Sequence, residues 1–157
     1  MRYTQGKYPI INKISIAKEM YDMTILCKEI AEIAVPGQFV HILADGHTLR
    51  RPISIASIDK EKGTIRIVFE VRGKGTEEIA KKNVNEIIDI VGPLGGGGFK
   101  LLDKEKKVVC IGGGIGTPPM LALCEYYGKN ATVISGFRNA SIAILQKDFA
   151  DTGANTI

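Results

Sequence analysis

The sequence has few cysteines and no long hydrophobic run, and both absences restrict what the chain can be. Its three cysteines, Cys27, Cys110 and Cys124, are odd in number and far apart along 157 residues. This spacing disfavours a disulfide framework and a zinc or iron–sulfur site, so we expect reduced thiols buried as small hydrophobic side chains in a cytoplasmic protein. No apolar stretch approaches the roughly 20 residues needed to cross a bilayer, and no secretory signal opens the sequence, so neither a membrane nor export is expected.

A concentrated patch of one charge is also missing. The net charge is +4, but lysines and arginines are interleaved with aspartates and glutamates. A nucleic-acid partner would require a basic stripe, so none is expected. Hydrophobic residues make up 45% and charged residues 24%, which is typical of an ordinary globular protein with a real core.

The sequence up to about residue 100 has the pattern of short strands. Ile65, Ile67, Phe69 and Val71 alternate with polar residues, with Val68 as an exception. A glycine-bearing turn at 59–64 connects this strand to residues 51–57, which predicts a hairpin. Further strands are expected at 11–16, 21–27, 38–43 and 86–91, and this spacing predicts a small antiparallel barrel. Only one helix is expected there, with Thr76 as its N-cap, running to about residue 82.

The pattern of apolar residues changes after the glycine-rich segment 92–99. Residues 107–111 form a short apolar run typical of a strand that is buried on both faces of a parallel sheet. A helix at 117–128 and a strand at 131–137 follow, so the order predicts a strand–helix–strand unit. We therefore expect two domains, 1–100 and 101–157. The second is about half the length of a doubly wound nucleotide domain, so the chain is expected to be truncated there.

Four glycines lie between the apolar run and the pair Pro118 and Pro119. Glycines at the end of a parallel strand bring bare N–H groups close to a ligand, and the following helix start favours an anionic diphosphate. The alternative is a structural turn without a ligand. The spacing differs from the usual G-x-G-x-x-G fingerprint, and no acidic residue closes the next strand. A Walker A loop is excluded because no Lys-Ser or Lys-Thr follows.

Five short motifs occur in an order that resembles a known family. They are RPIS at 51–54, GKGT at 73–76, GPLG at 92–95, GGGIGTPPM at 112–120 and GFR at 136–138. In this order they resemble the ferredoxin reductase superfamily and, within it, the electron transfer subunits of type B dihydroorotate dehydrogenases. The resemblance implies a six-stranded antiparallel FAD-binding β-barrel followed by an incomplete doubly wound NAD-binding α/β domain.

The resemblance also implies which residues hold the cofactors. Arg51 is expected to pair with the FAD diphosphate and Ser54 to lie near flavin N5. The expected FAD-binding residues are Arg51, Pro52, Ile53, Ser54, Val68, Phe69, Glu70, Gly75 and Thr76. The expected NAD-binding residues are Gly112, Gly113, Gly114, Ile115, Gly116, Thr117 and, near the adenosine, Arg138. Arg50 is either a surface charge or a second phosphate partner, and the choice between NAD and NADP stays open.

The implied function is electron relay in pyrimidine biosynthesis, in a hetero-oligomer with the dihydroorotate dehydrogenase catalytic subunit. No side chain is expected to act as a catalytic acid or base, His41 and His47 included. The family's cysteine-rich segment, which ligates a [2Fe–2S] cluster, is missing, so no metal ligands are expected in this chain. The alternatives are another ferredoxin reductase-like subunit and a non-catalytic flavin-binding fragment. An extra glycine in 92–99 is expected to loosen the connection between the domains.

Overall fold

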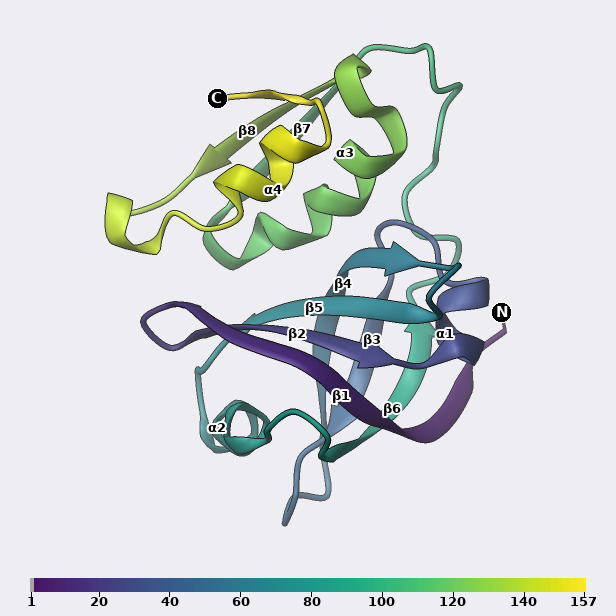
Figure 1. The fold of residues 1–157 in the computed structure, drawn as a ribbon, viewed down its shortest axis with the longest axis vertical. Helices are drawn as coiled ribbons and strands as arrows, with labels where there is room; N and C mark the ends of the chain where they lie inside the picture. The colour runs from purple at the N-terminus through teal and green to yellow at the C-terminus, as the bar shows by residue number, and fades with distance from the viewer. Residues whose placement is uncertain (1) are drawn as a thin grey trace.

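The computed structural model describes residues 2–157 as a β-barrel followed by a smaller α/β unit (Figure 1). Six antiparallel strands close the barrel in the order β1-β2-β5-β4-β3-β6. These strands are β1 (Thr4–Ala17), β2 (Met20–Leu26), β3 (Phe39–Leu43), β4 (Arg50–Asp59), β5 (Thr64–Glu70) and β6 (Ile87–Leu94). The barrel expected from the alternation and from the family resemblance is confirmed.

The barrel interior is filled by isoleucines on alternate positions of its strands. Ile65 and Ile67 of β5 are fully buried in this core, together with Phe69. Val68 breaks the alternation because it lies on the opposite face of β5 and packs into a second core, which the α/β unit supplies. A side chain that seems misplaced in an isolated strand is therefore buried on the outside of the barrel.

Two helices accompany the barrel, one more than expected. Helix α1 (Lys28–Ile33) buries Ile30 and Ala31 against the barrel core, and at six residues it is too short to produce a periodic signal. Helix α2 (Lys74–Lys81) begins two residues before Thr76, so Thr76 is not the N-cap; that position is Gly73. The hydroxyl of Thr76 instead accepts bonds from the N–H groups of Arg72 and Gly73 and fixes the start of the helix.

The α/β unit is a three-stranded parallel sheet in the order β7-β8-β9. Its elements are β7 (Val108–Gly113), α3 (Leu121–Tyr127), β8 (Ala131–Gly136), α4 (Gln146–Asp151) and β9 (Asn155–Thr156). Two 3₁₀ turns, Gly114–Gly116 and Pro118–Met120, separate β7 from α3, and two more lie at Gly128–Asn130 and Ala140–Ile142. Gly128 ends α3 with φ 53°.

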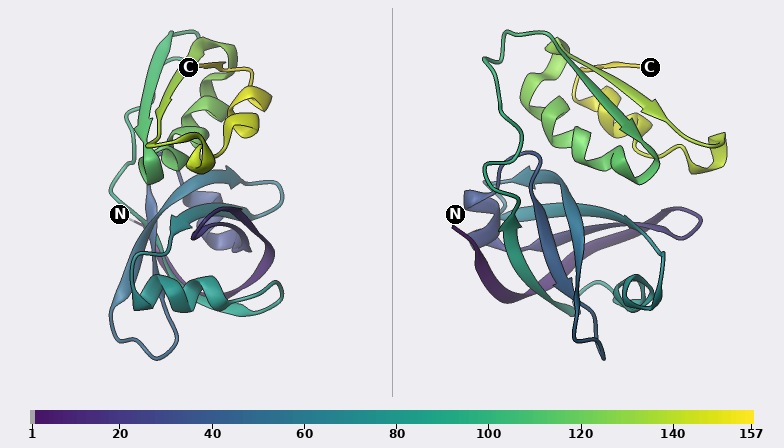
Figure 2. Two further views of the ribbon diagram at one scale, coloured as in Figure 1. Left: turned by 90° about the vertical axis from the view of Figure 1, so that its left-hand side faces the viewer. Right: turned by 180° about the vertical axis from the view of Figure 1, so that it is seen from behind.

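Only one face of this sheet is covered, because α3 and α4 lie on the same side (Figure 2). Cys110 and Val133 point toward the helices and are buried, whereas Val109 and Ile111 on the other face are 63% and 71% exposed. The expectation that residues 107–111 are buried on both faces is wrong. A run of apolar residues is the same whether one face or both are covered, so the run alone does not distinguish the two cases.

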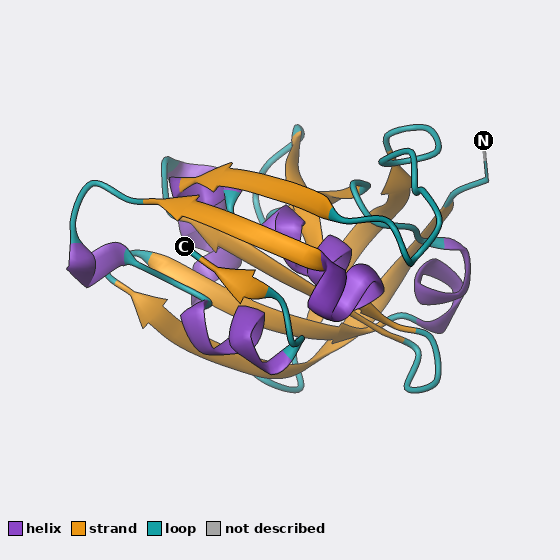
Figure 3. Ribbon diagram, turned by 90° about the horizontal axis from the view of Figure 1, so that it is seen from above, coloured by secondary structure: helices purple, strands orange, loops and turns teal. Residues whose placement is uncertain are grey.

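The barrel and the α/β unit share one packed boundary. Met20, Ala56 and Val68 of the barrel belong to the same buried cluster as Leu121 and Cys124 of α3. Seen from above, the helices of the α/β unit lie over the strands of the barrel (Figure 3). Arg66 of β5 pairs with Asp22 of β2 and with Asp148 of α4, so an ionic bridge crosses this boundary.

The connection between β6 and β7 is anchored rather than loose. The side-chain amide of Gln38 donates to the carbonyl of Gly96 at 2.6 Å, and the N–H of Phe99 donates to the carbonyl of Pro36 at 2.8 Å. Gly95, Gly96 and Gly98 have positive φ angles, so the glycines allow a tight turn here. The expected boundary at residues 100 and 101 falls within this segment. None of the helices described between residues 2 and 157 has the length and apolar character to span a membrane.

Candidate cofactor-binding site

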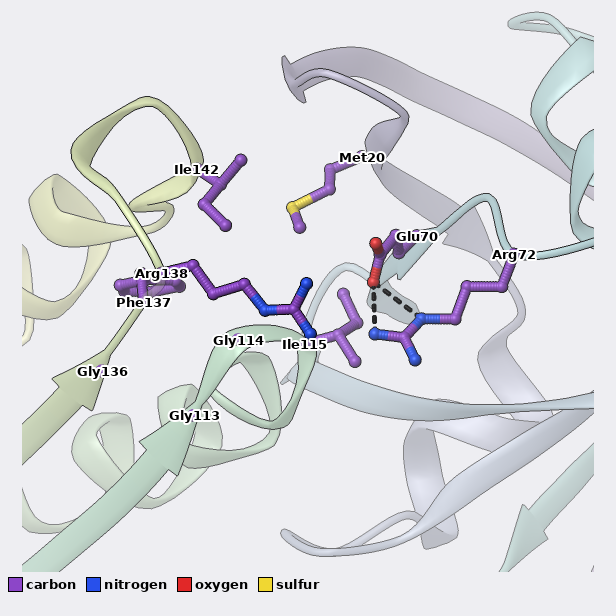
Figure 4. A pocket seen from close by; sticks show the side chains of 10 residues that line it. All are labelled: Met20, Glu70, Arg72, Gly113, Gly114, Ile115, Gly136, Phe137, Arg138 and Ile142. Atoms are coloured by element: carbon purple, nitrogen blue, oxygen red, sulfur yellow. Dashed lines mark hydrogen bonds and ion pairs between the residues drawn. The ribbon is translucent and has the colours of Figure 1, made fainter.

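Two adjoining cavities lie where the barrel meets the C-terminal ends of β7 and β8. The first is a groove of about 230 Å³. The second is a cavity of about 540 Å³ (Figure 4). The groove is lined by Pro52, Ile53, Ser54, Val68, Phe69, Glu70, Arg72, Thr76 and Ile115. The cavity is lined by Met20, Glu70, Arg72, Gly113, Gly114, Ile115, Gly136, Phe137, Arg138 and Ile142. The two share Glu70, Arg72 and Ile115, so they adjoin along a common wall.

Strands β4 and β5 supply the walls of the groove. Pro52 and Ser54 of β4 and Glu70 of β5 are at least partly exposed, so their side chains can meet a ligand. Ile53, Val68 and Phe69 are buried in the two cores, and Phe69 stacks on Tyr21 with ring centroids 5.9 Å apart. These three residues therefore shape the groove and can present only main-chain atoms or ring edges to it.

Arg51 lies across the start of α2 beside the groove. A Cβ built on Gly75 would lie 2.7 Å from Cζ of Arg51, so only glycine admits the guanidinium at this place. Nη1 of Arg51 donates to the carbonyl of Leu49 at 2.9 Å, and among residues 2–157 no carboxylate pairs with it. A cation at the positive N-terminus of a helix is electrostatically unfavourable unless an anion joins them. The arrangement therefore fits a diphosphate that both can bind.

Arg50, its neighbour in the sequence, has a structural role. Nη2 of Arg50 lies 2.7 Å from a carboxylate oxygen of Asp89 on β6, and Nη1 lies 3.4 Å from the carbonyls of His41 and Asp89. These contacts connect β4 with β3 and β6. Of the two possibilities that the sequence leaves open, the free surface charge is wrong because Arg50 pairs with Asp89, and the phosphate partner stays a prediction.

The glycines after β7 have two different roles. Some are required by the packing of the protein itself, and others leave the larger cavity open. A Cβ on Gly112 would lie 2.7 Å from Cα of Thr117, so the protein itself requires glycine there. Gly113 has an ordinary φ of −119°, and within residues 2–157 no atom outside its chain neighbours lies within 4 Å of its Cβ position, so packing does not require a glycine. Gly113 pairs in register with Gly136, which is equally open, and both line the larger cavity. The missing side chains leave room for a ligand at the ends of two parallel strands.

Not all residues of the expected NAD-binding set reach the cavity. Gly113, Gly114, Ile115 and Arg138 line it, whereas Gly112, Gly116 and Thr117 do not. Thr117 is fully buried, and its Oγ1 has no hydrogen-bond partner in the described chain. The structure thus places the end of β7 and the first two residues of the 3₁₀ turn, Gly114 and Ile115, at the cavity, whereas Thr117 is buried away from it.

Several lining residues escape sequence reasoning. Arg72 pairs with Glu70 through Nε at 2.8 Å and Nη2 at 2.7 Å. Met20, at the β1–β2 turn, and Ile142, in the 3₁₀ turn after β8, come from opposite sides of the cavity (Figure 4). Their positions depend on how loops pack, and no motif marks them. Gly136 could have been found, because it is the glycine of the GFR motif.

No cysteine is among the residues that line the two cavities. All three cysteines are buried, as expected, and burial raises the pKa of Cys27 to about 12. Within residues 2–157 no group of three or more His, Cys, Asp and Glu side chains could hold a metal ion.

Comparisons with known proteins support the family resemblance. No protein-family model matches the chain. The chain is 35% identical over 152 residues to the dihydroorotate dehydrogenase B (NAD(+)) electron transfer subunit of Bacillus mycoides strain KBAB4. This alignment covers 92% of the chain and 58% of the relative. It is 33% identical over 161 residues to the same subunit of Shouchella clausii strain KSM-K16, covering 98% of this chain and 62% of that relative. The chain therefore spans about three fifths of the length of these relatives.

A solved structure gives the same result for the fold. The structure of an NADH-dependent reduced ferredoxin-NADP oxidoreductase, described for flavin-based electron bifurcation, superposes with a TM-score of 0.84 at 28% identity. The match covers 96% of this chain and 55% of that chain. The barrel and the α/β unit together correspond to part of a ferredoxin reductase-like fold.

Proposed function

Because this chain belongs to the ferredoxin reductase-like oxidoreductases and is a homologue of the electron transfer subunits of dihydroorotate dehydrogenase B, we propose that it binds FAD and a nicotinamide dinucleotide. In this proposal it relays electrons between a dihydroorotate dehydrogenase catalytic subunit and NAD. It would then be a subunit of a cytoplasmic hetero-oligomer that acts in pyrimidine biosynthesis. The alternatives are that the chain is a subunit of another ferredoxin reductase-like NAD(P)H:acceptor oxidoreductase, or a non-catalytic flavin-binding fragment, and the experiments below separate them.

The observation that carries the proposal is the shared wall between the two cavities. Glu70, Arg72 and Ile115 line both the barrel groove and the cavity at the ends of β7 and β8. Hydride transfer requires that nicotinamide and flavin rings come into contact. Two distant pockets would not support this chemistry, whereas two pockets that share a wall place their ligands next to each other.

The residues of the chain would hold the cofactors and supply no acid or base. Arg51 and the N–H groups at the start of α2 would bind the FAD diphosphate, with Gly75 making room for the guanidinium. Ser54 would offer its hydroxyl to the flavin, and the bare main chain at Gly113 and Gly136 would admit the dinucleotide. Bound FAD would accept hydride from NADH and release electrons one at a time.

The experiment tests flavin uptake first and reduction second. The flavin-free chain is titrated with FAD, and binding is followed by the absorbance and fluorescence of the flavin. We expect one FAD per chain and a yellow protein that anaerobic NADH bleaches in stopped flow. A chain that takes up no FAD would contradict the proposal.

The acceptor is tested by adding either a dihydroorotate dehydrogenase catalytic subunit or a ferredoxin to the flavin-loaded chain. Electron transfer to the catalytic subunit alone supports the proposed partner. Transfer to ferredoxin alone would support the other reductase. Flavin that binds but is not reduced by NADH would support a non-catalytic flavin-binding role.

A further inference from the structure

The ion pair between Glu70 and Arg72 stands on the wall that the two cavities share, and Arg72 belongs to none of the motifs. We propose that Arg72 binds a diphosphate, and that Glu70 pairs with its guanidinium as long as no diphosphate is bound. Its guanidinium leaves Glu70 for the diphosphate of a nicotinamide dinucleotide in the 540 Å³ cavity, so Glu70 weakens dinucleotide binding. The inference rests on the proposed function, because it requires a dinucleotide in this cavity.

The geometry and exposure of the Glu70–Arg72 ion pair allow Arg72 to exchange Glu70 for another anion. Nε and Nη2 of Arg72 both contact the same oxygen of Glu70, at 2.8 Å and 2.7 Å. The side chain of Arg72 is 70% exposed and that of Glu70 is 28% exposed. Exposed ion pairs contribute little to stability because water competes with both partners. A diphosphate offers more charge than one carboxylate and matches the planar donor fork of arginine, so it can displace Glu70.

The backbone at Arg72 is held while its side chain is free to move. The N–H of Arg72 donates to Oγ1 of Thr76 at 2.9 Å, and the N–H of Val71 donates to the carbonyl of Glu19 at 2.8 Å. These bonds fix the segment between β5 and α2. Only rotation of the Arg72 side chain is therefore needed to move its guanidinium from Glu70 into the cavity.

The opposite wall of the cavity completes an anion site. Arg138 comes from the segment after β8, and its guanidinium points across the cavity toward Glu70 and Arg72 (Figure 4). Glu70, Arg72 and Arg138 are the charged residues among those that line the cavity. While Glu70 neutralises Arg72, one cation remains available; once Arg72 is released, two cations flank the open main chain of Gly113 and Gly136. A ligand with two negative charges would then be bound from both the barrel and the α/β unit.

Binding measurements on four matched variants test this exchange. NADH and ADP-ribose are each titrated into the flavin-loaded chain, and flavin content is measured for every variant because Glu70 and Arg72 also line the groove. We expect Arg72→Gln to weaken both ligands about tenfold. Glu70→Gln should tighten both by about twofold to fivefold. The double variant should bind both ligands more weakly than Glu70→Gln alone, because the gain from removing Glu70 depends mainly on the release of Arg72.

Lys74→Gln is the control, because it removes a nearby exposed cation that lines neither cavity. It should change either affinity by less than about twofold. The inference is overturned if Arg72→Gln behaves like Lys74→Gln, or if Glu70→Gln weakens binding. It is also overturned if NADH is weakened while ADP-ribose is not, because Arg72 would then contact the nicotinamide half.

Failure of the proposed function would produce a different pattern. If the wild-type chain takes up no FAD, the proposed function fails, and ADP-ribose titrated into the flavin-free variants still tests Arg72. If the wild-type chain binds FAD and NADH but the variants at 70 and 72 do not differ from the control, only the inference fails. A wild-type chain that binds neither NADH nor ADP-ribose overturns both.

Discussion

The main chain at Gly75 lies against the guanidinium of Arg51, and a Cβ at residue 75 would come within 2.7 Å of Cζ of that side chain. One residue belongs to β4 and the other to the first turn of α2, so a strand and a helix meet here with no side chain between them. The glycine therefore determines where the positive charge of Arg51 can lie. This relationship explains why two of the motifs occur together.

A side chain at residue 75 should displace Arg51 and weaken FAD binding. Charge-assisted hydrogen bonds contribute about 1.5–3 kcal/mol, so Arg51→Gln should raise the Kd for FAD about tenfold to a hundredfold. Gly75→Ala should raise this Kd less, by about twofold to tenfold, because it moves the guanidinium aside without removing its charge. Gly97→Ala is the control, because Gly97 lines neither cavity, its φ is not positive, and within residues 2–157 no atom outside its chain neighbours lies within 4 Å of a Cβ there. Equal FAD affinity in all three variants would exclude Arg51 as a diphosphate ligand.

Loss of the Arg66 side chain should destabilise the whole fold. Nε of Arg66 donates to both carboxylate oxygens of Asp22 at 2.9 Å and 2.8 Å, and Asp22 is only 2% exposed. Arg66→Met leaves this carboxylate buried without its partner, which should lower the free energy of unfolding by about 3–5 kcal/mol in urea.

Asp148→Asn is the comparison for this variant, because Asp148 contacts the same guanidinium from α4 with 31% of its side chain exposed. Its loss should cost at most about 1 kcal/mol. Equal costs for Arg66→Met and Asp148→Asn would mean that the bridge across the boundary, and not the buried carboxylate, is the important contact.

Cys27 should resist alkylation until the chain unfolds. Burial raises the pKa of its thiol from 9.0 to about 12, and the side chain is 1% exposed. At pH 9 about half of these thiols are ionised in the unfolded chain but roughly one in a thousand in the folded chain, and only the thiolate reacts. Because the folded pKa is raised, this group favours unfolding as pH rises from 9 toward 12. Iodoacetamide labelling at pH 9, read by mass spectrometry with and without urea, checks this; rapid labelling of native Cys27 would contradict it.

The sequence predicts the barrel well because the alternation of Ile65, Ile67 and Phe69 is a local property of the strand. The position of Val68 becomes clear only when the α/β unit packs against β5, which is a tertiary effect. Helix α1 is missed because six residues contain fewer than two turns of periodicity. The coverage of the small sheet is misjudged because the choice of face for α3 and α4 is a matter of topology.

The same limit applies to the site. The family resemblance predicts most residues of the groove, including Pro52, Ser54 and Glu70. The separate roles of Gly112 and Gly113 depend on whether Thr117 fills the space beside them, which spacing alone does not reveal. Arg72 is missed because its importance comes from a cavity formed by two units of the chain.

The exposure of one face of the β7-β8-β9 sheet can be tested by comparing the stability cost of truncating two valines on opposite faces. Val133 of β8 is fully buried beneath the helices, whereas Val109 of β7 lies on the other face with 63% exposure. Val133→Ala removes two buried methyl groups and should cost about 2 kcal/mol in urea unfolding. Val109→Ala should change stability by less than about 0.5 kcal/mol, because the side chain is already in water. Both variants change the same residue type in neighbouring strands, so β propensity cancels to a first approximation. If Val109→Ala costs as much as Val133→Ala in the isolated chain, this face is covered in solution, and the arrangement of both helices on one side does not describe the whole environment of the sheet.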